Sequence, residues 1–187
     1  MALLAQVPAP NAAGTTAGHH VFSLKNLEAA NQLWDALGAG RGTLGPLKVV
    51  KFPGALFLIR PAENQGGTEG SSGNYLGFKV KDLKAALAKL DAIGGKPLWG
   101  ATTGATATQA FVMAPDQIKV HLTEDKSLAT PVASDEAHVA VPNPAEAEAW
   151  YGKYFGTNIP ARALRSSKPR ARWRAPRAAR STGWNLR

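Results

Sequence analysis

The sequence predicts an α+β fold built from repeated βαβββ modules. The stretch from Gly18 to Gly38 reads as a short strand, an asparagine turn, an amphipathic helix and a glycine stop. The same pattern returns 56 residues later, from Asn74 to Gly94, and a looser copy runs from Ala137 to Gly156. A repeat of this length is one supersecondary unit that buries its apolar face against its neighbours. We therefore expect paired modules followed by an incomplete third module.

Both complete copies share a cap, an apolar stripe and a stop. Asn26 and Asp82 are expected to cap the two helices, and Gly38 and Gly94 to end them. Between cap and stop, apolar residues recur at helical spacing. These are Leu27, Ala30, Trp34 and Leu37 in the first copy, and Leu83, Ala86, Leu90 and Ile93 in the second.

Each of these helices is followed by two strand-like runs joined by a turn that contains proline, which is typical of a hairpin. The runs are 47–52 and 55–59 in the first copy, and 108–113 and 118–122 in the second. A glycine- and serine-rich joint at 64–73 separates the modules. The expected organisation is a disordered leader at 1–17, a two-module domain at 18–126, a linker at 127–136, the start of a second, truncated domain at 137–158, and a disordered Arg-rich tail at 159–187.

Composition limits the class of protein. The chain of 187 residues is 44% hydrophobic and has no cysteine, which excludes disulfide frameworks, thiolate nucleophiles and cysteine-ligated metals. No run approaches the roughly 18–20 apolar residues of a membrane span, so we expect no membrane segment. The sequence as written favours a cytoplasmic protein. The Ala-Leu-Leu-Ala-Gln run near the start leaves open the stub of a signal peptide, and with it a secreted or periplasmic protein.

The net charge of +9 belongs to one end of the chain. Residues 1–160 hold 13 basic and 13 acidic side chains, and residues 161–187 hold the other nine basic residues and no acid. A nucleic-acid partner is therefore not expected for the neutral body. Non-specific nucleic-acid binding by the tail stays open as a minor alternative.

Alternation along the strands predicts which side chains face a shared surface. His19, Leu58, Tyr75 and His121 take related positions on that surface, with Val21 and Lys119 beside them, whereas His20 turns toward the helix. Two imidazoles and a phenol can hold a divalent metal or act as acid–base groups. The alternative is that these are ordinary exposed or half-buried strand residues.

The repeated module, the His19-x-x-x-x-Leu-x-Asn start and the Pro-Asp-x-x-x-x-His121-Leu strand resemble the vicinal oxygen chelate superfamily. The resemblance covers His19 to about Asp125. This superfamily includes glyoxalases, bleomycin- and fosfomycin-resistance proteins and extradiol dioxygenases. It implies a glyoxalase-like arrangement, in which paired modules enclose a cavity for a small molecule.

Metal-binding members of this superfamily offer one ligand from the first strand and one from the last strand of each module. By that pattern the resemblance implies a metal site at His19, His121 and Tyr75, with His20 as the alternative to His19, and catalytic roles for His121 and Tyr75. The metal would be zinc, nickel, iron or manganese. The sequence departs from the pattern where Tyr75 replaces a common His, and where Leu58 and His121 replace common glutamates.

Two further departures bear on the expected structure. Gln117 stands where a turn glycine is usual, which predicts strain in the second hairpin. His138 matches His19 in the third copy, but the hairpin strands that should follow it do not appear before the Arg-rich tail. We interpret this ending as a truncated or frame-shifted second domain.

Two functions remain open on these grounds. One is a metal-dependent lyase, isomerase or dioxygenase acting on a small molecule. The other is a metal-free binding protein similar to the bleomycin-resistance proteins, which sequester a ligand, commonly at a dimer interface, so a homodimer is among the expectations.

Overall fold

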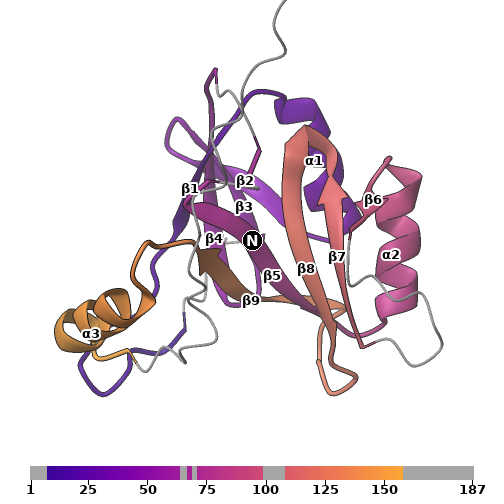
Figure 1. Cartoon of the computed structure of the whole chain (residues 1–187). Coiled ribbons are helices and arrows are strands. Elements are labelled where there is room, and N and C mark those ends of the chain that lie inside the picture. Colours follow the sequence, from indigo (N-terminus) through magenta and orange to yellow (C-terminus); the bar gives the residue numbers. More distant parts are fainter. Residues whose placement is uncertain (1–7, 64–66, 69–70, 99–107, 158–187) are drawn as a thin grey trace, which may run out of the picture.

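Two βαβββ units and the start of a third make up the fold (Figure 1). The computed structural model describes residues 8–63, 67–68, 71–98 and 108–157. The first unit forms a four-stranded sheet in the order β1-β4-β3-β2, in which β1 is parallel to β4 and the other neighbours are antiparallel. Its elements are β1 (His20–Leu24), α1 (Leu27–Ala36), β2 (Gly40–Leu44), β3 (Leu47–Phe52) and β4 (Ala55–Pro61).

The second unit repeats this arrangement and gains a strand from the segment after it. Its five-stranded sheet has the order β6-β7-β8-β5-β9, with β5 parallel to β8 and antiparallel to β9. The predicted α+β class and paired βαβββ modules are thereby confirmed. The elements are β5 (Gly73–Val80), α2 (Leu83–Ala92), β6 (Lys96–Pro97), β7 (Gln109–Ala114), the 3₁₀ turn η1 (Pro115–Gln117) and β8 (Ile118–Glu124), followed by β9 (Val132–Val139) and α3 (Pro144–Phe155).

The structure differs from the sequence prediction at three strands. The runs that form β2 and β6 were not identified, because β2 contains two glycines and β6 has two residues, one of them proline. The last of the three, β9, begins at Val132, whereas the sequence predicted a strand that begins near Ala137. The second half of the expected linker at 127–136 is therefore part of the second sheet.

The helix ends follow the predicted caps and stops. The side-chain Oδ1 atoms of Asn26 and Asp82 each accept a hydrogen bond from the backbone N–H three residues on, at 3.0 and 2.8 Å. Gly38 and Gly94 follow the helices with φ of 76° and 82°, a conformation that costs glycine little. The repeat seen in the sequence is thus a repeat of local structure.

The turn between β7 and β8 confirms the strain predicted at Gln117. Asp116 and Gln117 have φ of 58° and 57°, and neither is a glycine. Two hydrogen bonds hold the turn in place. The backbone N–H of Asn26 donates to Oδ2 of Asp116 at 3.3 Å, and the backbone N–H of Thr68 donates to the carbonyl oxygen of Gln117 at 3.0 Å.

One hydrophobic core joins the helix-side faces of both units. Trp34 of α1 is fully buried, and its ring centroid lies 6.3 Å from that of Phe52 and 5.7 Å from that of Phe57. The ring centroid of Phe52 lies 4.9 Å from that of Phe78 in the second sheet. Because this core takes one face of each sheet, the opposite faces turn away from it.

The third unit is represented by β9 and by α3, which extends away from the two sheets (Figure 1). Trp150 and Tyr154 on α3 are 50% and 59% exposed. Within the expected leader, Asn11 donates from Nδ2 to the carbonyl oxygen of Phe155 at 2.8 Å.

The Arg-rich tail at 159–187 lies outside the described residues. Among the helices that are described, none has both the length and the apolar character needed to cross a membrane.

Candidate functional site

Four rings share the face of the second sheet that turns away from the core. Tyr75 on β5 is in register with His138 on β9, and Phe111 on β7 is in register with His121 on β8. Residues directly opposed on neighbouring strands point to the same side of a sheet. Gly77, two residues from Tyr75, is opposite His121 and links the two pairs. We call Tyr75, Phe111, His121 and His138 the ring cluster.

The ring cluster consists of two stacked pairs set edge to face. The rings of Tyr75 and His138 lie 4.4 Å apart between centroids with an interplanar angle of 5°, and those of Phe111 and His121 lie 4.3 Å apart at 12°. Tyr75 meets Phe111 at 85° and His121 at 79°. Both arrangements are favoured by aromatic pairs. His138 is buried and the other three residues are half-buried, so the cluster forms a continuous aromatic surface.

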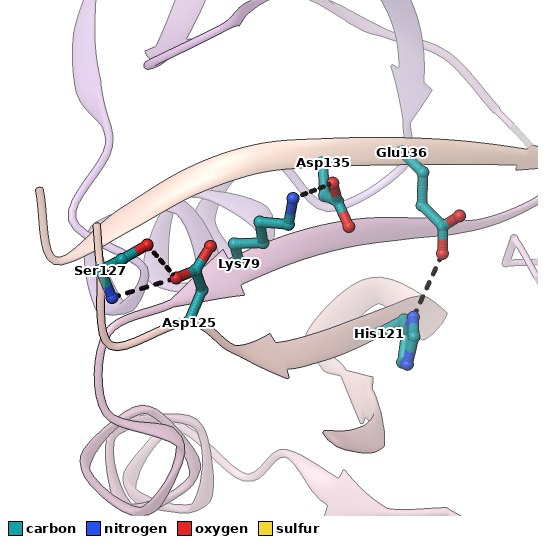
Figure 2. Close-up of polar contacts among 6 residues, drawn as sticks. All are labelled: Lys79, His121, Asp125, Ser127, Asp135 and Glu136. Atoms are coloured by element: carbon teal, nitrogen blue, oxygen red, sulfur yellow. Dashed lines mark hydrogen bonds and ion pairs between the residues drawn. The ribbon is translucent and has the colours of Figure 1, made fainter. Parts of the chain in front are cut away.

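Both ring nitrogens of His121 face oxygen atoms. Nδ1 lies 3.2 Å from Oε1 of Glu136 on β9, as Figure 2 shows, and Nε2 lies 3.3 Å from Oε1 of Gln109 on β7. A carboxylate beside Nδ1 favours a proton on that nitrogen and fixes the plane of the ring. The side chain of His121 is 14% exposed and that of Glu136 is 37% exposed. The pair is therefore partly shielded from water.

Gly77 makes room for this pair. β5 lies between β8 and β9 in the sheet, so the Glu136 side chain has to cross β5 to reach His121. A Cβ atom on Gly77 would stand 2.3 Å from Cγ of Glu136, far inside a van der Waals contact. The glycine in β5 is thus part of how the site is built.

Two lysines lie on the same face of the second sheet as the ring cluster. Lys119 Nζ lies 5.7 Å from the ring centroid of Tyr75 and 6.0 Å from that of Phe111, within the range of a cation–π interaction. Lys79 is paired with Asp135 at 3.2 Å, as drawn in Figure 2. The face thus combines apolar rings with a small number of charged groups.

The structure brings together three of the residues singled out from the sequence. Tyr75 and His121 are members of the ring cluster, and Lys119 lies beside it. His19 is exposed and precedes β1 in the first sheet. Within the described residues, no hydrogen bond, ion pair or ring contact joins His19 to the ring cluster.

The remaining predicted residues belong to the first sheet. Val21 and Leu58 are register partners on β1 and β4. His20 turns toward the helix side, as alternation predicted, and its ring centroid lies 5.6 Å from that of buried Phe57. Burial, followed by the neighbouring charge of His19, lowers the pKa of His20.

Four residues of this site were missed by the sequence reasoning. Phe111 and Gln109 could have been found by pairing the second hairpin outward from its turn, which sets Phe111 opposite His121. Glu136 was assigned to a linker. His138 was placed on the correct kind of face but without partner strands, because the pairing of β9 with β5 spans two modules.

The donor set does not suit a protein-bound divalent metal. Zinc and related ions usually take three or four protein ligands, and around His121 the nearby carboxylate is that of Glu136. In the part of the chain that the structure describes, no group of three or more His, Cys, Asp or Glu side chains could hold a metal ion. The metal site expected at His19, His121 and Tyr75, which includes a tyrosine, stays a prediction.

The repeated unit, with its first strand parallel to its last in both sheets, is the arrangement that the sequence resemblance implied. The paired units resemble the vicinal oxygen chelate fold. Among solved structures, the fosfomycin resistance protein FosX from Listeria monocytogenes aligns with this chain at a TM-score of 0.48 and 13% identity, over 62% of this chain and 94% of that chain.

Two further solved structures show a similar likeness. FosX from Mesorhizobium loti aligns at a TM-score of 0.44 and 16% identity, over 58% of this chain and 91% of that chain. A protein described as a putative glyoxalase, from Bacillus halodurans, aligns at a TM-score of 0.45 and 19% identity, over 57% of this chain and 93% of that chain. No family model and no curated protein matches the sequence. The likeness is one of fold and says nothing of what this chain binds.

Proposed function

We propose that the chain binds a small organic molecule with a flat ring on the ring cluster of the second sheet. The observation that supports this function is the meeting of two stacked ring pairs at nearly right angles. A flat ligand can contact one ring by its face and another by its edge. Small-molecule sites are typically apolar surfaces with a few fixed polar groups, and His121, held by Glu136 and Gln109, supplies such a group.

Aromatic contacts carry the binding in this proposal. Each favourable ring pair contributes about 0.5–1.5 kcal/mol beyond the area that it buries. Loss of one ring should therefore weaken binding by roughly two- to tenfold. The proposal invokes no metal bridge, because the described His, Cys, Asp and Glu side chains form no group of three or more that could hold a metal ion.

The similar structures support a small-molecule ligand in general and no particular one. A FosX variant from Listeria monocytogenes was solved with Mn(II) and 1S,2S-dihydroxypropylphosphonic acid, at a TM-score of 0.44 and 14% identity to this chain. The metal-dependent alternative would need a group of ligands that the described His, Cys, Asp and Glu side chains do not form. We therefore favour metal-free binding over a metal-dependent reaction.

Thermal unfolding with 2-naphthol as the probe tests this proposal. We expect 2-naphthol to raise the melting temperature in the presence of EDTA, because a ligand that binds the folded state stabilises it by mass action. Phe111→Leu, which keeps an apolar side chain but removes the ring, should reduce this shift. Tyr154→Leu on α3 is the matched control, since this residue is 59% exposed and α3 extends away from the two sheets (Figure 1).

Two results would contradict the proposal. A shift that requires added Mn(II) or Zn(II) would favour the metal-dependent alternative. A metal-free shift of the same size in Phe111→Leu and in the unsubstituted protein would place the ligand elsewhere.

A further inference from the structure

A hollow of about 240 Å³ lies between α1 and α2, which are side by side (Figure 1). The end of α1, the end of β5, the first turns of α2 and Pro131 just before β9 surround it. Val80 of β5 lines the hollow and belongs to the hydrophobic core, whereas Tyr75 on the same strand points to the opposite face of the sheet. The hollow is therefore separate from the ring cluster.

Small side chains keep the hollow open. Ala36 lines it from α1, and Ala85 and Ala86 line it from α2. The internal repeat shows that the opening is particular to the second unit. Ala86 is half-buried, but its counterpart Ala30, 56 residues earlier, is fully buried. The same position of the repeat is thus packed in one unit and open in the other.

The lining of the hollow is mainly apolar. Leu37 and Val80 contribute to it, and they are 5% and 2% exposed. Of the described residues that line the hollow, none has an aromatic ring. An apolar ligand gains free energy here by leaving water, but it finds no ring on which to stack. This lining suits an aliphatic group, in contrast to the rings on the second sheet.

Two lysines, Lys81 and Lys89, line the same hollow. Among the described residues, neither ammonium group has an ion pair or hydrogen bond with an acidic side chain. The acidic residue in the described lining is Asp82, whose carboxylate already accepts a hydrogen bond from the backbone N–H of Ala85 at 2.8 Å. The balance of charge at the hollow is therefore positive, which favours an anionic ligand.

From these features we infer that the hollow binds a short aliphatic carboxylate, with its chain on the apolar lining and its carboxylate beside Lys81 and Lys89. This is a second site, and it does not depend on the function proposed for the ring cluster. Drug-sized ligands occupy pockets of about 300–1,000 Å³, so a hollow of about 240 Å³ suits a smaller molecule. The aliphatic chain supplies most of the affinity, because ion pairs with exposed lysines contribute little.

Titration of the full chain with sodium octanoate, followed by amide NMR, tests this site. We expect saturable shift changes at Ala36, Ala85 and Ala86, with the signals of Tyr75 and His121 unchanged. Butanoate should bind at least about tenfold more weakly than octanoate, because each buried methylene group strengthens binding about fourfold. Octylammonium has the same chain and the opposite charge, so it should bind at least about fivefold more weakly.

Two pairs of variants locate the ligand. Ala85→Leu fills the hollow and should weaken octanoate binding by at least about tenfold. Its control is Ala88→Leu, at an exposed position of the same helix outside the lining. Lys89→Gln removes one ammonium group and should weaken binding about two- to fivefold. Its control is Lys84→Gln, which is also exposed on α2 and outside the lining.

The absence of saturable shift changes at the hollow would overturn the inference. So would octylammonium binding as tight as that of octanoate, or equal octanoate affinity in the unsubstituted protein and in Ala85→Leu that is folded by circular dichroism. If Ala85→Leu does not fold, the Lys89→Gln and Lys84→Gln pair decides, and equal affinity in these two variants would contradict the site. Because 2-naphthol tests the ring cluster, failure of either site is seen separately.

Discussion

The side chain of Glu136 lies directly over Gly77, where a Cβ atom would stand 2.3 Å from Cγ of Glu136. This contact lets a carboxylate on β9 reach His121 on β8 across the strand between them. Glycine inside a strand weakens it and often marks a close approach of other groups. Here the close approach joins the third unit to the candidate site.

Gly77→Ala should separate Glu136 from His121. The added methyl group forces the glutamate aside, and overpacking of this kind costs about 1–3 kcal/mol of unfolding free energy. We expect urea unfolding to show that loss and NMR to show altered ring signals of His121. Gly73→Ala is the control on the same strand, because a Cβ there meets nothing within 4 Å. Unchanged His121 signals in Gly77→Ala would refute this account of the site.

Gln117→Gly should stabilise the protein. The left-handed conformation costs an ordinary residue about 1–2 kcal/mol, and glycine gives back about 0.5–1 kcal/mol through its greater freedom in the unfolded chain. We expect a net gain of about 0.5–1 kcal/mol in the unfolding free energy. Gly54 has φ of 85° in the first hairpin turn, so Gly54→Gln should change stability in the opposite direction. A loss of stability in Gln117→Gly would contradict the strain described at this turn.

Ser127→Ala should change how stability depends on pH. The hydroxyl and the backbone N–H of Ser127 donate to Asp125 Oδ1 at 2.5 and 3.0 Å (Figure 2), and chiefly for this reason the pKa of Asp125 is lowered. A lowered folded pKa gives stability above the unfolded pKa that is lost as the pH falls through the folded value. The substitution should raise the pKa of Asp125 and reduce that acid-dependent loss.

Carboxyl NMR titration of Asp125, together with urea unfolding between neutral and acidic pH, checks this prediction. Ser71→Ala removes a hydroxyl that bonds other backbone groups, and it should leave the titration of Asp125 unchanged. An equal pKa of Asp125 in the Ser127→Ala and unsubstituted proteins would show that the hydrogen bonds have no such effect.

Local signals in the sequence predicted most of the fold. Asn26, Asp82, Gly38 and Gly94 mark the helix ends because caps and stops act over a few residues. Strand alternation correctly separated His20 from its neighbours, because the two faces of a strand differ in burial. Short or glycine-rich strands such as β2 and β6 carry too little apolar pattern to be recognised.

The candidate site was harder to predict because it depends on pairing between distant strands. Tyr75 and His121 come from one module and were grouped correctly. His138 and Glu136 enter through the β5–β9 pairing, which no local pattern specifies. His19 was grouped with them by analogy between the modules, but the structure places it beside the first sheet.

NMR mapping of 2-naphthol binding, with EDTA present, tests the central claim most directly. We predict that the largest chemical-shift changes occur at the four residues of the ring cluster and at Gln109. A competing location is a hollow of about 240 Å³ between α1 and α2, lined in part by Ala36 and Ala86. Shift changes confined to that hollow, with the ring cluster unaffected, would contradict the assignment of the second sheet as the binding face.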